Sequence, residues 1–420
     1  MQTNSTSQGA APASSHPSGL PNNYYWFFII YMAALSAFGS FINDMYVPSL
    51  PEMCRHFHAS TSTVQLGLSF GMLGLGLGQM ILGPVSDRVG RKPVLIGSII
   101  LFTIACVVSI FSPTIGFFLV CRFFQGVGGS GGYFLARTMP ADIVGGRVLA
   151  KMMAIIGAIN GIAPASAPVI GGFMADAAGW RGTFVLLVVI GIVLLCFSPK
   201  LKETLPVAKR ETGSLWEAFR GYGLLFRNRK FMIHVILKGS ALGLLFAYVS
   251  SAPFIMQDHY GWSQSAFGVI MGLNAVLMAI GSMVALKFKY LKNAARFGGY
   301  LLLIMIVGEA VSLWFVDSFW VYEAWIVPAL FAMGIIFTAG NTLAMNEGRS
   351  DAGAASAVLG LSGYVFGMTA SPLVGLGNLL HSTAITFGVL AVIVFIVSLI
   401  SGRMAPDLVA SSITTPDVKK

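Results

Sequence analysis

The sequence contains 420 residues, of which 56% are hydrophobic and only 10% are charged, and its formal net charge is +10. A soluble domain carries roughly 25% charged residues, so this chain has too few to cover a water-facing surface. The composition excludes a soluble multidomain protein and indicates that much of the apolar surface faces lipid. The basic residues are dispersed among loops between apolar segments, which argues against nucleic-acid binding.

Residues 1–23 are rich in Ser, Pro, Ala and Asn and contain no Lys or Arg. A cleavable signal peptide begins with a basic region, so we predict a disordered cytoplasmic tail here instead. The aromatic residues 24–26 that follow are expected to anchor the first helix at the membrane surface.

Long apolar runs follow the tail. A membrane-spanning helix needs about 20 apolar residues. Twelve segments meet this requirement, so we predict an all-α membrane protein with about twelve transmembrane helices in two six-helix bundles. The predicted spans are 25–47, 61–82, 93–111, 114–136, 149–173, 180–198, 231–256, 263–286, 296–315, 320–346, 353–379 and 383–402.

The longest connection, residues 199–230, is rich in Lys and Arg and separates the sixth span from the seventh. It divides the chain into bundles at 24–198 and 231–402, which leaves a cytoplasmic tail at 403–420. Within the connection, Trp216–Phe226 has the pattern of a short amphipathic helix on the membrane surface. Two parallel halves of this kind are typical of transporters, with the substrate bound near mid-membrane between them.

The distribution of basic residues predicts the orientation. With both termini inside, only Arg55 and Arg181 fall outside, and only Arg122 and Lys238 lie within spans. The other 22 of the 26 basic residues then lie on the inner side. Because basic loops remain on the cytoplasmic side, we predict that both termini are cytoplasmic.

The loop predicted after the second span carries a dense motif, G-x-x-x-D-R-x-G-R-K. Its glycines permit a tight turn, and its charged side chains offer partners to nearby acids and bases. The alternative is an ordinary basic inner loop. The motif residues are Gly83, Asp87, Arg88, Gly90, Arg91 and Lys92.

At this loop the chain resembles the major facilitator superfamily, and the resemblance extends over essentially residues 25–402. It implies the major facilitator fold and a loop that latches the two halves together on the cytoplasmic side when the carrier opens outward. The implied partners are Asp142 after the fourth span and the start of the eleventh span near Asp351.

A second motif, R-x-x-Q-G, lies in the fourth span, where Arg122, Gln125 and Gly126 share one helix face. An arginine within a span must face a cavity or a partner. The resemblance implies a part in proton transfer; the alternative is a structural arginine bonded to neighbouring carbonyl groups.

Asp44 lies near the outer end of the first span, in the same half of the membrane as Arg122, so the two can pair. Burial raises the pKa of a carboxyl group and a cationic neighbour lowers it, so a changing separation would switch a proton on and off. We therefore predict proton coupling at Asp44 and Arg122. The alternative is that Asp44 only anchors the helix end.

The fifth span contains A-P-x-x-A-P-x-x-G-G at residues 163–172, which resembles the antiporter motif of drug exporters. Alanines replace its first two glycines, and a generic kinked helix is the alternative. With the D-x-Y-x-P-S-L-P run that begins at Asp44, the motif resembles the bicyclomycin and chloramphenicol resistance branch, Bcr/CflA. The antiporter residues are Pro164, Pro168, Gly171 and Gly172.

Several polar and aromatic residues within spans are candidates for the wall of a substrate cavity. Helix packing is the alternative for the aromatic and amide side chains, and Lys238 can instead extend its amine to the membrane surface. Glu309 is either buried against a neighbour or a second titratable site. The cavity candidates are Tyr31, Phe38, Phe41, Gln125, His234, Lys238, Tyr248, Asn274, Phe337 and Asn341.

The sequence contains no P-loop and no nucleophilic or metal-ligand constellation, and its four cysteines lack metal-ligand spacing. We therefore expect neither an enzyme nor a metal site or cofactor, and we expect the proton gradient to drive transport. The expected partners are a small-molecule substrate, protons and membrane lipid, with no nucleic acid, and the chain is expected to be a monomer.

The resulting hypothesis is a proton-coupled antiporter that exports amphipathic or cationic compounds across the bacterial cytoplasmic membrane. Three alternatives stay open. The chain can be a dedicated exporter of a metabolite such as a nucleoside, sugar or amino acid. It can be a proton-coupled uptake symporter, or a membrane scaffold that transports nothing.

Overall fold

The computed structural model describes residues 21–211, 223, 225–316, 318–349 and 352–405. The first half of the chain folds into five long helices and one short one. The 3-10 turn η1 (Val47–Ser49) joins the first long helix to the short one. These helices are α1 (Asn22–Asp44), α2 (Leu50–Phe57), α3 (Thr61–Val89), α4 (Arg91–Ile110), α5 (Ile115–Ile143) and α6 (Gly146–Phe197).

After α6, the chain forms the 3-10 turns η2 (Ser198–Lys200) and η3 (Val207–Lys209) before it enters the second half. A π-helical segment, η4 (Phe254–His259), extends the first helix of that half. The helices of the second half are α8 (Arg229–Pro253), α9 (Gln264–Ala285), α10 (Leu291–Phe315), α11 (Phe319–Glu347), α12 (Ala352–Leu373) and α13 (Leu379–Met404).

The predicted fold class is confirmed. Ten helical segments in the described part of the chain are long and apolar enough to cross a membrane. The helix α6 is one of the ten but consists of two span-length parts, and α5 is a further long helix with Arg122 and several glycines in it. Twelve helices therefore run through the described bundle, and the protein is a multi-pass membrane protein.

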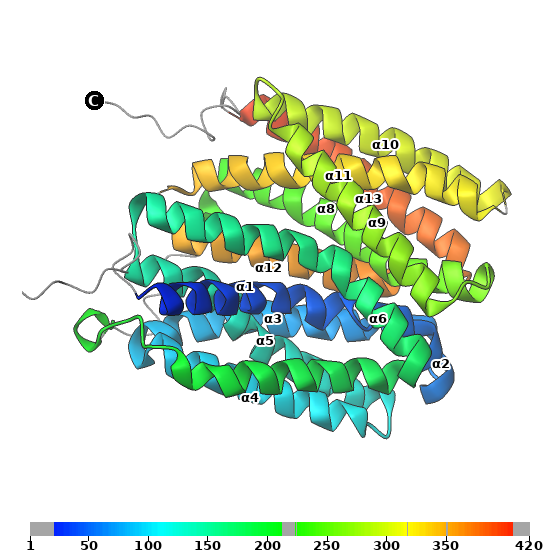
Figure 1. Cartoon of the computed structure of the whole chain (residues 1–420). Coiled ribbons are helices and arrows are strands. Elements are labelled where there is room, and N and C mark those ends of the chain that lie inside the picture. Colours follow the sequence, from blue (N-terminus) through cyan, green and yellow to red (C-terminus); the bar gives the residue numbers. More distant parts are fainter. Residues whose placement is uncertain (1–20, 212–222, 224, 317, 350–351, 406–420) are drawn as a thin grey trace, which may run out of the picture.

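The two halves lie side by side, with the first half mostly below the second in Figure 1. Contacts between α6 and α9 and between α3 and α12 join them. The start of α1 and the end of α13 lie at one end of the bundle, which we call the terminal end; α2 lies at the opposite end, which we call the α2 end (Figure 1).

Glycines allow the helices of the first half to touch through their backbones. A Cβ atom on Gly126 of α5 would overlap the carbonyl oxygen of Gly71 in α3, and one on Gly74 would overlap that of Phe123. Lipid tails are as apolar as the helices, so association depends on close packing of this kind rather than on the hydrophobic effect. The glycine-rich sequence of α5 therefore serves close helix packing, with Gly126 against α3 and Gly128 against α4.

Two predicted loops are wrong. The loop predicted at residues 83–92 is helical except at Gly90, because α3 continues through Pro84 to Val89 and α4 begins at Arg91. The break predicted between residues 173 and 180 is a kink at Gly179 (φ 66°) inside α6. In both places one glycine with positive φ makes the turn that several loop residues were expected to make.

Other predictions fall outside the described residues. These are Asp351, most of the surface helix Trp216–Phe226, and most of the two terminal tails, 1–23 and 403–420.

The two halves are joined by hydrogen bonds at the α2 end. In η4, Gln257 donates to the carbonyl oxygen of Pro48 (2.8 Å), and Gln65 of α3 donates to that of Ser250 (2.9 Å). The backbone N–H of Ser265, at the start of α9, donates to the Asp176 carboxylate of α6 (2.9 Å). These contacts close the α2 end of the space between the halves.

The first prediction concerns Gly126. Gly126→Val should lower the free energy of unfolding by about 2 kcal/mol, because the added side chain forces α5 away from α3. The melting temperature of the detergent-purified protein measures the effect. Gly116→Val is the matched control on the same helix, since a Cβ atom there has nothing within 4 Å. Equal losses in both variants would show that helix propensity, not packing, explains the result.

The second prediction concerns closure at the α2 end. Asp176→Ala removes an acceptor from the N-terminus of α9, a contact of about 1 kcal/mol, so the population open at the α2 end should rise roughly fivefold. Distances between spin labels at Ser60 and Trp320 report this opening. Ala177→Ser is the control on the same exposed turn. An unchanged distance distribution in Asp176→Ala would mean that this contact does not help to hold the halves together.

Candidate functional site

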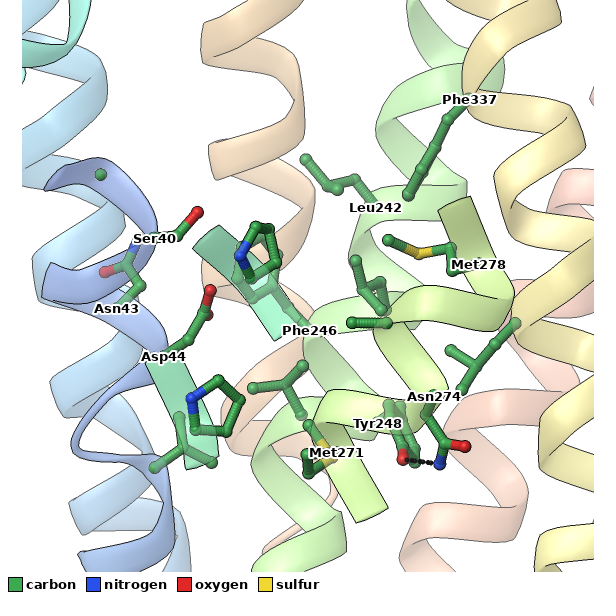
Figure 2. Close-up of a pocket in the computed structure, with 18 of the residues that line it drawn as sticks. Ser40, Asn43, Asp44, Leu242, Phe246, Tyr248, Met271, Asn274, Met278 and Phe337 are labelled. Atoms are coloured by element: carbon green, nitrogen blue, oxygen red, sulfur yellow. Dashed lines mark hydrogen bonds between the residues drawn. The ribbon is translucent and has the colours of Figure 1, made fainter. Parts of the chain in front are cut away.

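A cavity of about 400 Å³ lies between the two halves. Its walls come from α1, α5 and α6 on one side and from α8, α9, α11 and α12 on the other. The volume is sufficient for one small organic molecule. Figure 2 shows the cavity with the first half on the left and the second half on the right.

The wall from the first half carries the polar groups. Ser40, Asn43 and Asp44 lie on the last turns of α1, and the carboxylate of Asp44 points into the cavity (Figure 2). Asp44 is partly buried, and within the described residues its carboxylate has no hydrogen bond or ion pair. A carboxylate in this position can bind a proton or a cation from the cavity.

The wall from the second half is mostly apolar. Phe246, Met271, Met278 and Phe337 face the polar groups of α1 across the cavity (Figure 2). Aromatic and thioether side chains provide adaptable contacts for flat or irregular apolar ligands. Asn274 adds a polar patch to this wall beside Tyr248, to whose hydroxyl it donates (2.8 Å).

Arg122 is fully buried in the first half and does not pair with Asp44. Its guanidinium donates to the Gly67 carbonyl (3.2 Å), to Gln125 (2.7 Å) and, at 3.4 Å, to Asn43. Asp44 and Arg122 therefore form no salt bridge in this structure, although the two charges still interact electrostatically. Adjacent residues of a helix point in directions about 100° apart, so Asn43 faces Arg122 while Asp44 faces the cavity.

An aromatic ring completes the surroundings of this buried charge. The guanidinium lies 4.2 Å from the ring centroid of Tyr46, and Gln125 in turn donates to Ser109 of α4 (3.0 Å). Arg122 thus connects α1, α3, α4 and α5 through neutral partners. Through its contact with Asn43, Arg122 holds the turn of α1 that presents Asp44, and so acts as a positioning residue.

Three of the predicted cavity residues, Tyr248, Asn274 and Phe337, line this cavity. Two more, Lys238 and Asn341, line its extension toward the terminal end, where the lysine donates to the amide (3.0 Å). Arg137 and Tyr364 share that extension. The extension is more polar than the main cavity, and two of the side chains that line it, those of Arg137 and Lys238, are basic.

The other five candidates pack within one half, and their assignment to the cavity wall is corrected. Tyr31 donates to the Leu194 carbonyl (3.0 Å), and Phe38 packs on Phe102, with ring centroids 4.3 Å apart. His234 contacts the Ser401 hydroxyl (2.8 Å). Gln125 belongs to the Arg122 network, and Phe41 is packed against the main hydrophobic core. Sequence alone does not distinguish the helix face toward the cavity from the face packed inside one half, because polar and aromatic residues occur on both.

The residues predicted as a latch meet at the corner between α3 and α4. Arg91 pairs with Asp87 (2.6 Å) and with Asp142 at the end of α5 (3.0 Å). Glu203, which the sequence did not single out, accepts from the backbone N–H groups of Arg91 and Lys92 (2.9 and 3.1 Å). A carboxylate at a helix N-terminus is stabilising, so Glu203 binds the segment after α6 to the start of α4.

Two other latch residues differ in their surroundings. Arg88 lies 4.0 Å from Glu211, whereas a Cβ atom on Gly83 would have nothing within 4 Å. The φ of 115° at Gly90 favours glycine, and a Cβ atom there would also meet the carboxylate end of the Glu203 side chain at 2.6 Å.

The predicted antiporter residues lie where α6 faces both the cavity and the second half. Pro164 and Pro168 line the cavity. A Cβ atom on Gly171 would overlap the Met45 carbonyl, and one on Gly172 would overlap the carbonyl of Gln264 in α9. Here α6 thus touches the second half through its backbone.

The structure brings to the site several residues that were not predicted. Ser40 and Asn43 are ordinary polar residues of an apolar helix, and nothing in their spacing indicates a site. Glu323 is different, since an acid inside the predicted span 320–346 is the same signal that singled out Glu309. In the described residues, no group of three or more His, Cys, Asp or Glu side chains is arranged to hold a metal.

Comparisons with known proteins agree with this architecture. Residues 29–372 match the model of the Major Facilitator Superfamily. The chain is 35% identical to the uncharacterized MFS-type transporter YdgK of Bacillus subtilis (strain 168) over 372 residues, which are 85% of this chain and 90% of that protein. It is 31% identical to the multidrug resistance protein MdtL of Escherichia coli (strain UTI89) over 233 residues, 55% of this chain and 59% of the relative.

Solved structures share the fold at low sequence identity. The partially occluded inward-open xylose transporter XylE from E. coli matches with a TM-score of 0.71 and 12% identity, covering 92% of this chain and 99% of that one. A bacterial homolog of the human lysosomal transporter Spinster, inward-facing and occupied, matches with a TM-score of 0.73 and 15% identity, covering 92% and 98%. The twelve-helix fold, the cavity between its halves and the family match lead to one conclusion: this chain is a transporter of the Major Facilitator Superfamily.

Proposed function

We propose that this protein is a proton-coupled antiporter that exports amphipathic or cationic small molecules by alternating access. The observation that carries the proposal is the Asp44 carboxylate, which faces a largely apolar cavity without a bonded partner among the described residues. A proton and a cationic ligand can each neutralise this carboxylate, but they compete for it. Such competition is the simplest basis for exchange of a substrate against a proton.

The chemistry of the cavity supports this substrate class. One carboxylate lies opposite a wall with two phenylalanines and two methionines, which suits a ligand with a positive charge and an apolar body. The relative MdtL carries the name of a multidrug resistance protein, which agrees with such a ligand. The motifs at Asp44 and at residues 163–172 further support a place in the Bcr/CflA branch.

The direction of transport is part of the proposal. The distribution of basic residues supports a cytoplasmic terminal end in the inner membrane of a bacterium, with both termini inside. Closure at the α2 end then corresponds to an inward-facing state that can take up substrate from the cytoplasm. Arg91, Asp87 and Asp142 would stabilise the opposite state together with the start of α12, as the latch hypothesis requires.

In the proposed cycle, a cationic substrate enters from the terminal end and displaces the proton of Asp44 into the cytoplasm. The carrier then opens at the α2 end, where a proton binds Asp44 and the substrate leaves. Arg122 holds the end of α1 in place throughout and gives the site a positive background that favours release of the proton. The proton gradient supplies the driving force, and a single chain suffices.

A second candidate function is favoured by the extension of the cavity. Arg137 and Lys238 both face it, together with the amides of Gln79 and Asn341. Two cations on the entry path suit a ligand that also carries an anionic group, such as an amino acid. A dedicated metabolite exporter would use this extension for the anionic group and Asp44 for an ammonium group.

The third prediction tests Asp44. Asp44→Asn should abolish proton movement evoked by ethidium in proteoliposomes, because the amide carries no proton and offers the cationic ligand no negative charge to bind, so no exchange takes place. A pH-sensitive dye inside the vesicles measures the flux. Glu347→Gln, at the terminal end of α11, is the control and should retain the native flux. Undiminished coupled exchange in Asp44→Asn would rule out Asp44 as the essential proton site.

The fourth prediction separates the two substrate classes. Expression in an efflux-deficient bacterial host should raise the inhibitory concentration of lipophilic cations several-fold, and Lys238→Met should preserve this protection because these ligands do not need the amine. A metabolite exporter would instead release amino acids, nucleosides or sugars into the medium, and Lys238→Met would reduce that release. Metabolite release without any protection would overturn the drug-export proposal in favour of the second candidate.

A further inference from the structure

A second carboxyl group lies behind the wall of the cavity that comes from the second half. Glu323, on the second turn of α11, contacts Asn274 of α9, and Asn274 itself lines the cavity. Tyr248 of α8 also lines the cavity and bonds to the same amide (Figure 2). A continuous polar path therefore runs from the cavity through one amide to Glu323.

The distances along this path are compatible with a protonated Glu323. Asn274 Nδ2 lies 2.6 Å from Glu323 Oε1 and 2.8 Å from the Tyr248 hydroxyl. A distance of 2.6 Å is short for N–H···O but ordinary for O–H···O. When the amide is turned by 180°, its oxygen accepts from a protonated Glu323 and from Tyr248 at once, so both short contacts suit a neutral carboxyl group.

The burial of the second oxygen supports the same state. Glu323 Oε2 is fully buried and has no hydrogen-bond partner in the described part of the chain. A charged oxygen in this position would lose its hydration without compensation, whereas a neutral carboxyl group tolerates the site far better. None of the ion pairs among the described residues involves Glu323.

Within the described part of the chain, the titratable groups that interact with Tyr322 and Glu323 carry no positive charge. Tyr322 on its own helix interacts electrostatically with Glu323, Glu309 of α10, Tyr248 of α8, and Tyr260 after η4. All of these groups are neutral or acidic. A bound cation would therefore add a positive charge near Glu323 and would favour loss of its proton.

Glu309 differs from Glu323 in its access. Both of its oxygens are buried and without a hydrogen-bond partner in the described structure, and Glu309 does not line the cavity. A carboxyl group with no path to the cavity cannot exchange a proton when a ligand enters. Glu309 therefore fits a permanently neutral packing residue.

We propose that Glu323 is a second proton-carrying group of the transport cycle and exchanges its proton with the cavity through Asn274 and Tyr248. This inference rests on the proposed antiport. When a cationic ligand binds, the Asn274 amide turns away, a water molecule from the cavity reaches Glu323 and accepts its proton, and the N–H that the turned amide presents stabilises the carboxylate. Asp44 and Glu323 then each release one proton, so one monovalent cation leaves for every two protons that enter.

The fifth prediction is the proton-to-substrate ratio, measured in proteoliposomes with ethidium at zero membrane potential. With two protons exchanged, a pH difference of one unit should balance an ethidium gradient of about 100-fold, whereas one proton balances about tenfold. The native chain should show the larger value. Glu323→Gln should show the smaller one with exchange intact, and Glu347→Gln should match the native chain.

The outcomes separate the two proposals. A tenfold balance in both the native chain and Glu323→Gln would overturn the role of Glu323 and leave the antiport standing. No ethidium-evoked proton flux in the native chain would count against the antiport with this ligand. Asn274→Ala should give the ratio of Glu323→Gln, because the carboxylate then loses the N–H that stabilises it and Glu323 keeps its proton.

A second measurement tests Glu323 without transport. Infrared difference spectra of the purified native chain at low and high pH should contain the carbonyl stretch of one more protonated carboxyl group than those of Glu323→Gln. Glu309→Gln is the control and should leave the pH-dependent bands unchanged, since Glu309 does not exchange. Identical difference spectra for the native chain and Glu323→Gln would refute the assignment even if the vesicles show no flux.

Discussion

The buried guanidinium of Arg122 is the constraint around which the first half is arranged. Moving an ion from water into a protein interior costs several kcal/mol, so every donor of this group needs an acceptor. The Gly67 carbonyl, Gln125 and Asn43 provide them from three helices. Because all of these partners are neutral, the positive charge is solvated but not cancelled, and its field still acts on the cavity one helix face away.

Much of the fold could be predicted from the sequence, because lipid requires long apolar helices whose lengths are visible in composition alone. The errors have a common cause. Hydropathy indicates where a helix leaves the membrane and not where the helix itself ends. The helix α3 thus extends seven residues past the predicted span, to Val89. The loop predicted between residues 173 and 180 has the same cause, since the less apolar residues there lie on helical turns beside the kink at Gly179.

The site was less predictable. Motifs singled out Asp44 and Arg122, but spacing along one helix does not reveal which neighbour faces which surface, so the partner of Arg122 turned out to be Asn43. Tyr31 and His234 were assigned to the cavity although they pack inside their own halves. Glu203 and Glu323 act on residues more than 45 positions away, and only the folded chain shows such contacts.

The contact between α6 and α9 has a consequence for motion. Glycines on one helix meet backbone carbonyls on the other, as Gly172 meets Gln264, and Gly268 meets Pro168 in the reverse sense. A surface of this kind has few interlocking side chains, so α6 and α9 can change their relative orientation with little repacking. The two halves thus meet along a surface without large side chains. The ease with which they move against each other depends on the size of single residues there rather than on the strength of bonds.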